Sequence, residues 1–300
     1  MSLPLAVVRS LLRLLPRSTD TADSLTKAIS DRKGEAPVTD AARRAAHVTE
    51  RRVEGMRVVR LEPRHAHRDD SERAVPRAHL IYTHGGCYTF PIRGLHWDLL
   101  ARLVEGAHVS IDVPLYGLAP EHIAATEYPA LEAVYRQAIA EHPGRVFLGG
   151  DSAGGGLALG QAIAYRGAGL EAPRGILLLS PWVDVTMTNP GIARLEPRDH
   201  LIAPLGLVEA GRLWAGDLDV RDPRVSPLYG DLAGLAPVHI YQGDRDILAA
   251  DAYEVTRRLL RAGTPAELRI TRGGFHVFPA VGVLPEARLA VSRMVDVLRA

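Results

Sequence analysis

The sequence predicts a doubly wound α/β fold, in which a mostly parallel sheet carries helices on both faces. Short apolar runs alternate with helical patterns from about residue 79 to residue 299. The runs are apolar almost throughout, which is typical of strands that are buried on both faces of a parallel sheet. The chain has 300 residues, of which 47% are hydrophobic, so it can bury a large core.

Six apolar runs are predicted as strands: His79–Thr83, His108–Val113, Arg145–Leu148, Gly175–Leu179, Val238–Tyr241 and Ala266–Ile270. Five segments are predicted as helices: Leu95–Glu105, Tyr128–Glu141, Ala153–Arg166, Ala250–Ala262 and Pro285–Arg299. Upstream, the apolar residues between Val53 and Leu61 predict one or two further strands, which end in a charged turn at His65–Arg73.

The first 15 residues predict an amphipathic helix, because Arg9 and Arg13 interrupt a series of leucines and valines. The arginines break up the apolar core that a signal peptide requires, and we expect this helix to pack on the protein's own body. A membrane surface is the alternative partner for its apolar face. Residues 18–47 predict a polar, helical lead-in with a flexible break near Lys33–Glu35.

The stretch from about Thr186 to Leu228 departs from the alternation of strands and helices. It contains several prolines and one helical piece, Leu205–Ala215. We interpret this stretch as a cap inserted over the carboxyl edge of the sheet, where open α/β sheets bind their ligands.

Charge and cysteine content limit the classes of partner. The chain has 36 basic and 35 acidic residues, a formal net charge of +1, which gives no electrostatic reason to expect nucleic acid or an anionic membrane. Cys87 is the one cysteine, so an internal disulfide and a multi-cysteine metal site are excluded. No apolar stretch approaches the roughly 18–20 residues that span a bilayer. We expect a cytoplasmic protein without stable membrane insertion.

The segment Gly150–Gly154, Gly-Asp-Ser-Ala-Gly, follows an apolar run and precedes an alanine-rich helical pattern. This is G-x-S-x-G in the strand–turn–helix context in which a serine becomes an exposed nucleophile. The flanking glycines relieve crowding, and the N–H groups at the start of the helix favour a developing oxyanion. The motif predicts that Ser152 is a catalytic nucleophile.

A glycine loop upstream is expected to supply the second half of an oxyanion hole, with a plain glycine turn as the alternative. His84-Gly85-Gly86-Cys87 follows the predicted strand His79–Thr83, which is the position where backbone N–H groups complete such a hole. We assign the N–H groups of Gly85, Gly86 and Ala153 to it. We expect His84 to shape the loop and to transfer no proton.

The general base should follow the last strand, because chain order in this fold is serine, acid, histidine. His276 lies there, between the last strand and the last helix, and is the predicted base. Five other histidines lie in polar or terminal segments and are expected to be exposed to solvent: His47, His65, His67, His142 and His200. Three fall within predicted strands and are expected to be structural: His79, His108 and His239.

The triad acid should lie between Ser152 and His276, at the end of a strand, where it can hold the imidazole in the right tautomer. Four carboxylates meet this requirement, and spacing alone does not separate them: Asp184, Asp244, Asp246 and Asp251.

Together, these motifs resemble the hormone-sensitive-lipase-like branch of the α/β-hydrolase carboxylesterases, from about Arg77 to the end of the chain. The motifs are His84-Gly85-Gly86, Tyr116-Gly117-Leu118-Ala119-Pro120-Glu121, Gly150-Asp151-Ser152-Ala153-Gly154-Gly155, Ser226-Pro227-Leu228, Asp246-Ile247-Leu248 and His276-Val277-Phe278. The resemblance implies the α/β-hydrolase fold and Asp246 as the triad acid. The chain departs from the family pattern at Cys87, where the family usually has glycine or alanine.

The resemblance also implies a division of the chain. Residues 1–45 would form an N-terminal helical cap segment, and residues 46–300 the catalytic domain with a cap insertion at about 186–222. The cap would line an acyl pocket, with four apolar residues as candidates that could equally be ordinary core: Leu205, Leu207, Leu213 and Trp214.

The predicted activity is therefore hydrolysis of short- to medium-chain aliphatic or lipid-like esters through an acyl-enzyme on Ser152, with no metal or organic cofactor. An amidase or aryl-formamidase on the same scaffold is the alternative enzyme, and matched ester and amide assays separate the two. A non-catalytic small-molecule receptor is the alternative outside enzymes, which His276 disfavours, since receptor relatives lack it. A homodimer through the last strand and helix is left open.

Overall fold

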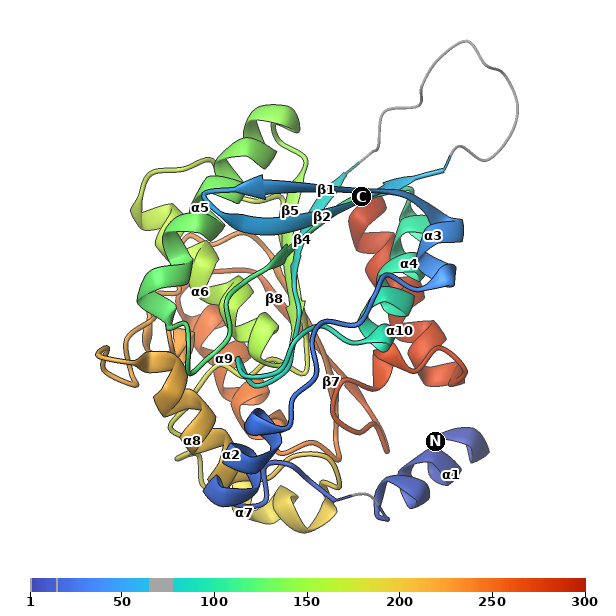
Figure 1. The fold of residues 1–300 in the computed structure, drawn as a ribbon, viewed down its shortest axis with the longest axis vertical. Helices are drawn as coiled ribbons and strands as arrows, with labels where there is room; N and C mark the ends of the chain where they lie inside the picture. Colours follow the sequence, from blue (N-terminus) through green and yellow to red (C-terminus); the bar gives the residue numbers. More distant parts are fainter. Residues whose placement is uncertain (1, 15, 65–77) are drawn as a thin grey trace.

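The computed structural model describes residues 2–14, 16–64 and 78–300, and its centre is one eight-stranded sheet (Figure 1). The strands lie in the order β1-β2-β4-β3-β5-β6-β7-β8. β1 and β2 pair antiparallel with each other, β2 pairs antiparallel with β4, and β3 to β8 run parallel. The strands are β1 Ala46–Val53, β2 Met56–Pro63, β3 His79–Thr83, β4 Ser110–Leu115, β5 Val146–Asp151, β6 Gly175–Leu179, β7 Val238–Gly243 and β8 Ala266–Thr271.

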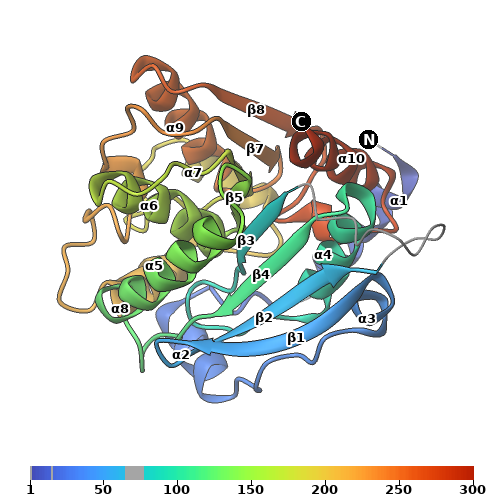
Figure 2. The same cartoon turned by 90° about the horizontal axis from the view of Figure 1, so that it is seen from above.

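Helices cover both faces of the sheet (Figure 2). α4 and α10 lie on one face, and α5, α6 and α9 lie on the other, each closing a separate part of the hydrophobic core. The helices are α1 Leu3–Leu12, α2 Ala22–Ser30, α3 Asp40–Ala45, α4 Gly94–Ala107, α5 Ala124–Glu141, α6 Ala153–Gly167, α7 Ile192–Leu195, α8 Pro204–Ala215, α9 Ala249–Arg261 and α10 Pro285–Arg299, with short 3₁₀ turns at Glu196–Arg198, Pro227–Tyr229 and Phe278–Ala280.

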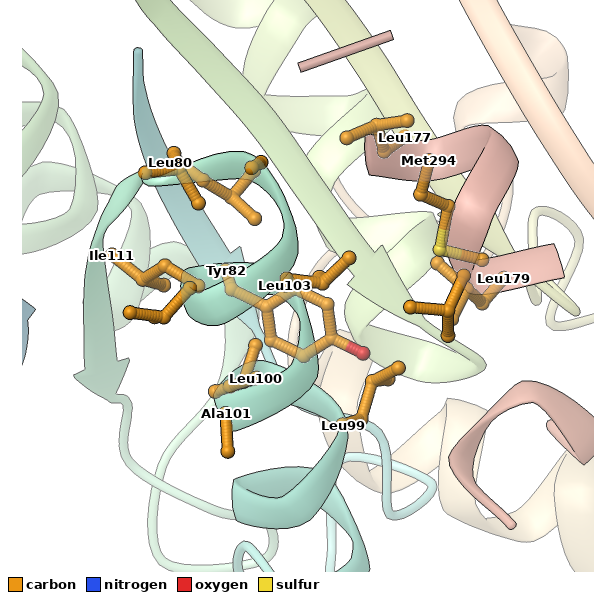
Figure 3. Packing of buried hydrophobic residues seen from close by; sticks show 14 of the residues in the cluster. Leu80, Tyr82, Leu99, Leu100, Ala101, Leu103, Ile111, Leu177, Leu179 and Met294 are labelled. Carbon is orange, nitrogen blue, oxygen red and sulfur yellow. The ribbon is translucent and has the colours of Figure 1, made fainter. Parts of the chain in front are cut away.

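The central strands are buried on both faces, as their apolar composition predicts. Every residue of β3, β5 and β6 is buried. Leu80 and Tyr82 of β3 point toward α4, where they pack with its leucines, and Met294 of α10 extends the same cluster (Figure 3). Burial of such side chains stabilises the folded state by about 1.5–3 kcal/mol each. This packed layer therefore holds in place the strand ends that carry the motifs.

The predicted strands and helices are all present, and β3, β6 and α10 have the predicted bounds. One strand was placed too early. β4 begins at Ser110, and His108 is the left-handed residue that ends α4, with φ 52° and its N–H bonded to the Val104 carbonyl. The expectation that His108 belongs to a strand was therefore wrong. The charged turn predicted at His65–Arg73 lies wholly outside the described residues.

The N-terminal segment packs on the protein's own body, as predicted. Leu5 of α1 is fully buried against the core cluster that contains α10, and the Ser2 hydroxyl donates to Glu286 at its start. Leu3 and Leu11, on the other side of α1, are exposed. No helix in the described part of the chain has both the length and the apolar character needed to cross a bilayer.

The N-terminal segment also contacts the inserted segment. α2 lies against α8 (Figure 1), and the Ala203 and Gly206 N–H groups donate to Thr19. A Cβ on Gly206 would lie 2.5 Å from the Thr19 Cα, so this close approach requires glycine. Two parts of the chain far apart in sequence therefore form one packed layer.

Candidate active site

Ser152 occupies a strained turn between β5 and α6. Its backbone has φ 53° and ψ −122°, a conformation that a side chain disfavours and that is typical of functional turns. The turn is tight because its glycines have no Cβ: a Cβ on Gly154 would lie 2.0 Å from the Thr83 carbonyl oxygen, and one on Gly150 would lie 2.4 Å from the Gly154 carbonyl oxygen. The G-x-S-x-G pattern is thus a steric requirement of this turn.

His276 reaches Ser152 from the loop after β8. Its Nε2 lies 2.9 Å from the Ser152 Oγ, and its Nδ1 lies 3.0 Å from the Asp246 Oδ2. Burial lowers the pKa of His276, but the Asp246 carboxylate, with smaller contributions from Asp199 and Asp151, raises it above its ordinary value overall. The structure therefore brings together the predicted nucleophile, base and one of the four candidate acids.

Asp246 is fully buried at the end of β7 and is held by two donors besides His276. Gln242 Nε2 donates to its Oδ2 over 2.7 Å, and the Leu248 N–H donates to its Oδ1 over 2.9 Å. The side chains of the other three candidate acids are engaged elsewhere. Asp244 accepts from the Gly273 N–H, Asp251 from Asn189, and Asp184 from Tyr229. Geometry thus separates the four carboxylates that spacing could not.

The loop after β3 corrects the predicted oxyanion hole. The Gly85 N–H donates to the Asp151 Oδ1 over 3.0 Å, so this donor is already bonded to a carboxylate. The N–H groups of Gly86 and Cys87 have no acceptor among the described residues. Ala153 is the first residue of α6, so its N–H has no partner within the helix. The donors next to Ser152 without a partner in the described chain thus include those of Gly86 and Cys87 in the glycine loop and that of Ala153 at the start of α6.

Asp151 joins the two loops that flank Ser152, and the sequence did not single it out. Its Oδ1 accepts from the Tyr82 hydroxyl as well as from Gly85, and its Oδ2 lies 3.2 Å from His96 Nε2. Burial raises the pKa of Asp151, but His96 and the other two donors outweigh burial and lower it overall. Its position inside the G-x-S-x-G motif was the available signal.

His84 shapes the glycine loop, as expected. Its Nδ1 lies 2.7 Å from the Gly85 carbonyl oxygen, and its ring stacks on Tyr116 at 4.6 Å. The Tyr116 hydroxyl donates to the His84 carbonyl. Burial lowers the pKa of His84 to about 4, so the imidazole is neutral at neutral pH. Burial raises the pKa of the neighbouring Cys87 to about 12, which keeps the thiol protonated.

The other histidines mostly have the predicted surroundings. His47 is exposed, and His79 and His239 lie in strands, whereas His65 and His67 are outside the described residues. His142 was expected to be exposed, but it is partly buried and stacks on His79 with ring centroids 4.4 Å apart. His200 is also partly buried, and Arg13 donates to its Nε2.

The four candidate pocket residues separate into two groups. Leu207 and Trp214 are buried in the same cluster as Cys87 and Ala153, and Trp214 stacks on Tyr88 at 4.5 Å. Leu213 is partly buried at the edge of this cluster. Leu205 is 64% exposed on the outer side of α8, so its expected place in a pocket was wrong. The helical period of α8 separates neighbouring leucines onto opposite faces.

This sheet, together with a serine, a histidine and a buried carboxylate in hydrogen-bond contact at its carboxyl edge, defines the class of α/β hydrolases that act through a serine. A family model described as the alpha/beta hydrolase fold matches residues 80–280. The chain belongs to this family.

Relatives of known name support the same class. The chain is 33% identical to an acetyl-hydrolase of Streptomyces hygroscopicus, covering 71% of this chain and 72% of the relative, and 27% identical to an esterase of Acinetobacter venetianus, covering 72% and 73%. Among solved structures, it is similar to an esterase from the bacterial hormone-sensitive lipase family, with a TM-score of 0.82, 28% identity, and 100% and 98% of the two chains covered. The predicted fold, the resemblance and the carboxylesterase type of activity are confirmed.

Proposed function

We propose that this chain hydrolyses short- to medium-chain aliphatic or lipid-like esters through an acyl-enzyme on Ser152. The contact that carries the proposal is the 2.9 Å separation of Ser152 Oγ and His276 Nε2, with Asp246 on the other ring nitrogen. That geometry suits a histidine that accepts the serine proton while a buried carboxylate stabilises the imidazolium.

The reaction has two balanced halves. In the first, His276 takes the Ser152 proton, Oγ bonds to the ester carbonyl carbon, and the alcohol leaves with the proton that His276 returns. In the second, His276 takes a proton from water, the water oxygen bonds to the acyl carbon, and Ser152 Oγ leaves with the proton that His276 returns, so that the acid is released and the enzyme is restored. In both, the oxyanion accepts hydrogen bonds from the N–H groups of Gly86, Cys87 and Ala153, of which Cys87 replaces the predicted Gly85.

Two observations support the proposed preference for apolar acyl groups of short to medium length. A buried cluster of Leu207, Trp214 and Tyr88 adjoins the proposed oxyanion hole, which favours an apolar acyl group. One relative is named an acetyl-hydrolase, and another, a Mycobacterium tuberculosis protein of which 42% is covered at 33% identity, is named a triacylglycerol lipase. We further propose that residues 1–45 and about 186–222 act together as the cap, since α2 lies against α8.

A series of p-nitrophenyl esters from acetate to decanoate, assayed beside p-nitroacetanilide, tests this proposal. We expect kcat/KM to be highest for short or medium acyl groups and to be far lower for the anilide. We expect Ser152→Ala to lower kcat/KM by about 1,000-fold or more while the fold is kept. Faster turnover of the anilide favours the amidase alternative, and binding without turnover favours a receptor.

Location and assembly are further proposals, each carried over from a sequence expectation. We propose a cytoplasmic location, which the free, buried thiol of Cys87 fits, and cell fractionation tests it.

We also propose pairing of two copies through β8 and α10, because β8 is an edge strand and Leu289 on α10 is exposed. Light scattering of the purified protein measures the mass of the assembly.

A further inference from the structure

A second buried carboxylate lies beside the triad acid and comes from the inserted segment. Asp199 follows the 3₁₀ turn Glu196–Arg198 and is 2% exposed. Its Oδ1 accepts from the N–H groups of Leu201 and Ile202, over 2.8 and 3.1 Å. Its Oδ2 accepts from the Ile247 N–H over 2.9 Å, and Ile247 directly follows Asp246 in the chain.

We propose that Asp199 is a positioning residue that holds the Asp246 turn, and through it His276, in the geometry that proton transfer from Ser152 needs. The inference rests on the proposed function, because that function assigns the roles of these three residues. Ile247 is fully buried, so without Asp199 its N–H would lack an acceptor inside the protein. A turn freed at this point would let Asp246 move, and small displacements of a triad member lower the rate strongly.

Asp199 is itself held from the other side by the N-terminal segment. Arg17 Nη1 donates to the Asp199 carbonyl oxygen over 3.1 Å, and the Ala203 N–H donates to the Thr19 hydroxyl over 2.8 Å. The side chain of Asp199 thus faces the triad, while its carbonyl group is bonded to Arg17 and the nearby Ala203 to Thr19. The two cap segments are in this way connected by hydrogen bonds to the residue after the triad acid.

Asp199 also adds negative charge near His276. The charged and titratable groups around the two residues come from three parts of the chain: Asp151 of β5 and Asp246 after β7, Arg13, Arg17 and Asp20 of the N-terminal segment, and Glu196 and His200 of the insertion. Burial, and then the Asp246 charge, raise the pKa of Asp199 to about 6. Ionised Asp199 stabilises the His276 imidazolium, so its removal should make the base less basic.

The test compares Asp199→Asn with the charge-preserving Asp199→Glu. For Asp199→Asn we expect kcat on p-nitrophenyl acetate to fall by about 10-fold or more, with KM within about twofold. We also expect the acid limb of its kcat/KM profile to move to lower pH by about half a unit. Asp199→Glu should keep the wild-type acid limb, although its kcat falls. The variant Glu196→Gln, at a partly buried residue of the same segment, controls for loss of a nearby charge and should change neither quantity.

A folded Asp199→Asn variant with wild-type kcat, or with lowered kcat and an unmoved acid limb, overturns the proposal. Asp199→Ser provides a second neutral variant, and failure of all three variants to fold also overturns it, because Asp199 would then serve folding alone. The outcome is distinct from failure of the proposed function, which Ser152→Ala and Asp246→Asn test directly. If Ser152→Ala and Asp246→Asn lose activity while Asp199→Asn behaves as the wild type, only the positioning role of Asp199 is contradicted.

Discussion

The Gly85 N–H donates to the Asp151 Oδ1 over 3.0 Å, which ties the loop after β3 to the residue that precedes Ser152. The same carboxylate accepts from Tyr82 and lies within reach of His96. Because this N–H is already bonded, Cys87 takes the place of Gly85 as a proposed donor to the oxyanion. We expect Asp151 to hold the glycine loop and the serine turn at a constant separation.

Asp151→Asn should weaken this connection, because an amide nitrogen would face one of the donors. We expect kcat for a short ester to fall by about 10-fold with a nearly unchanged KM, and the free energy of unfolding to drop by about 1–3 kcal/mol. Tyr82→Phe is the matched control, since it removes one donor and leaves Gly85 bonded, and should lower kcat less. Steady-state kinetics and urea unfolding measure both effects, and a wild-type kcat in Asp151→Asn contradicts this role.

Substitution of Asp246 and of Asp244 should show which of these two aspartates is the triad acid. Asp246→Asn is expected to lower kcat/KM by about 100-fold or more, because the amide can stabilise neither the imidazolium nor the required tautomer. Asp244 accepts from the Gly273 N–H and does not contact His276, so Asp244→Asn should stay within about threefold of the wild type. Equal losses in the two variants would contradict the assignment of the acid.

Two glycines of α6 test whether the turn at Ser152 requires a residue without a Cβ. Gly154→Ala would put a Cβ 2.0 Å from the Thr83 carbonyl oxygen, whereas a Cβ on Gly167 would meet nothing within 4 Å. We expect Gly154→Ala to lose more than about 2 kcal/mol of stability together with most activity, and Gly167→Ala to gain up to about 1 kcal/mol. Thermal unfolding and ester assays of both variants measure this, and a stable, active Gly154→Ala enzyme would refute it.

Asp251 should make stability depend on pH. It is fully buried, it accepts from Asn189, and burial raises its pKa from 3.8 to about 7. A carboxyl with a raised folded pKa stabilises the fold fully below its unfolded pKa, and this contribution is lost as pH rises from about 4 to about 7. Asp251→Asn should therefore be more stable than the wild type at pH 8, by about 2–4 kcal/mol, and similar to it at pH 4.

Urea unfolding across this pH range checks the expectation. The exposed variant Asp217→Asn is the control and should follow the wild-type curve at every pH. A difference between Asp251→Asn and the wild type that does not change with pH would show that Asp251 remains ionised in the fold.

The sequence predicts the parts of the fold and site that depend on local pattern. Continuous apolar runs are sufficient for β3 and β6, and a strand–turn–helix context is sufficient for Ser152. The motif order also identifies His276, because the base follows the last strand. These features need no knowledge of how loops pack.

Features that depend on the direction of backbone N–H groups, or on contacts between residues distant in sequence, were missed or wrongly predicted. Which N–H of the glycine loop faces the substrate depends on the positive φ angles of Gly86 and Cys87, 130° and 55°, which the sequence does not reveal. Asp244 and Asp246 both lie in the turn after β7, so only its three-dimensional course separates them. Asp199 lies 48 residues before Ile247, and no local pattern connects the two.

The central claim is that the Ser152 oxygen carries the acyl group. The most direct measurement is intact and peptide mass spectrometry of the enzyme quenched within its first turnovers of p-nitrophenyl acetate, with Ser152→Ala treated alike. We predict a burst of p-nitrophenol equal to the enzyme present and one acetyl group on the peptide that contains Ser152, both lost in Ser152→Ala. An acetyl group on another residue, or full turnover by folded Ser152→Ala, would contradict the account.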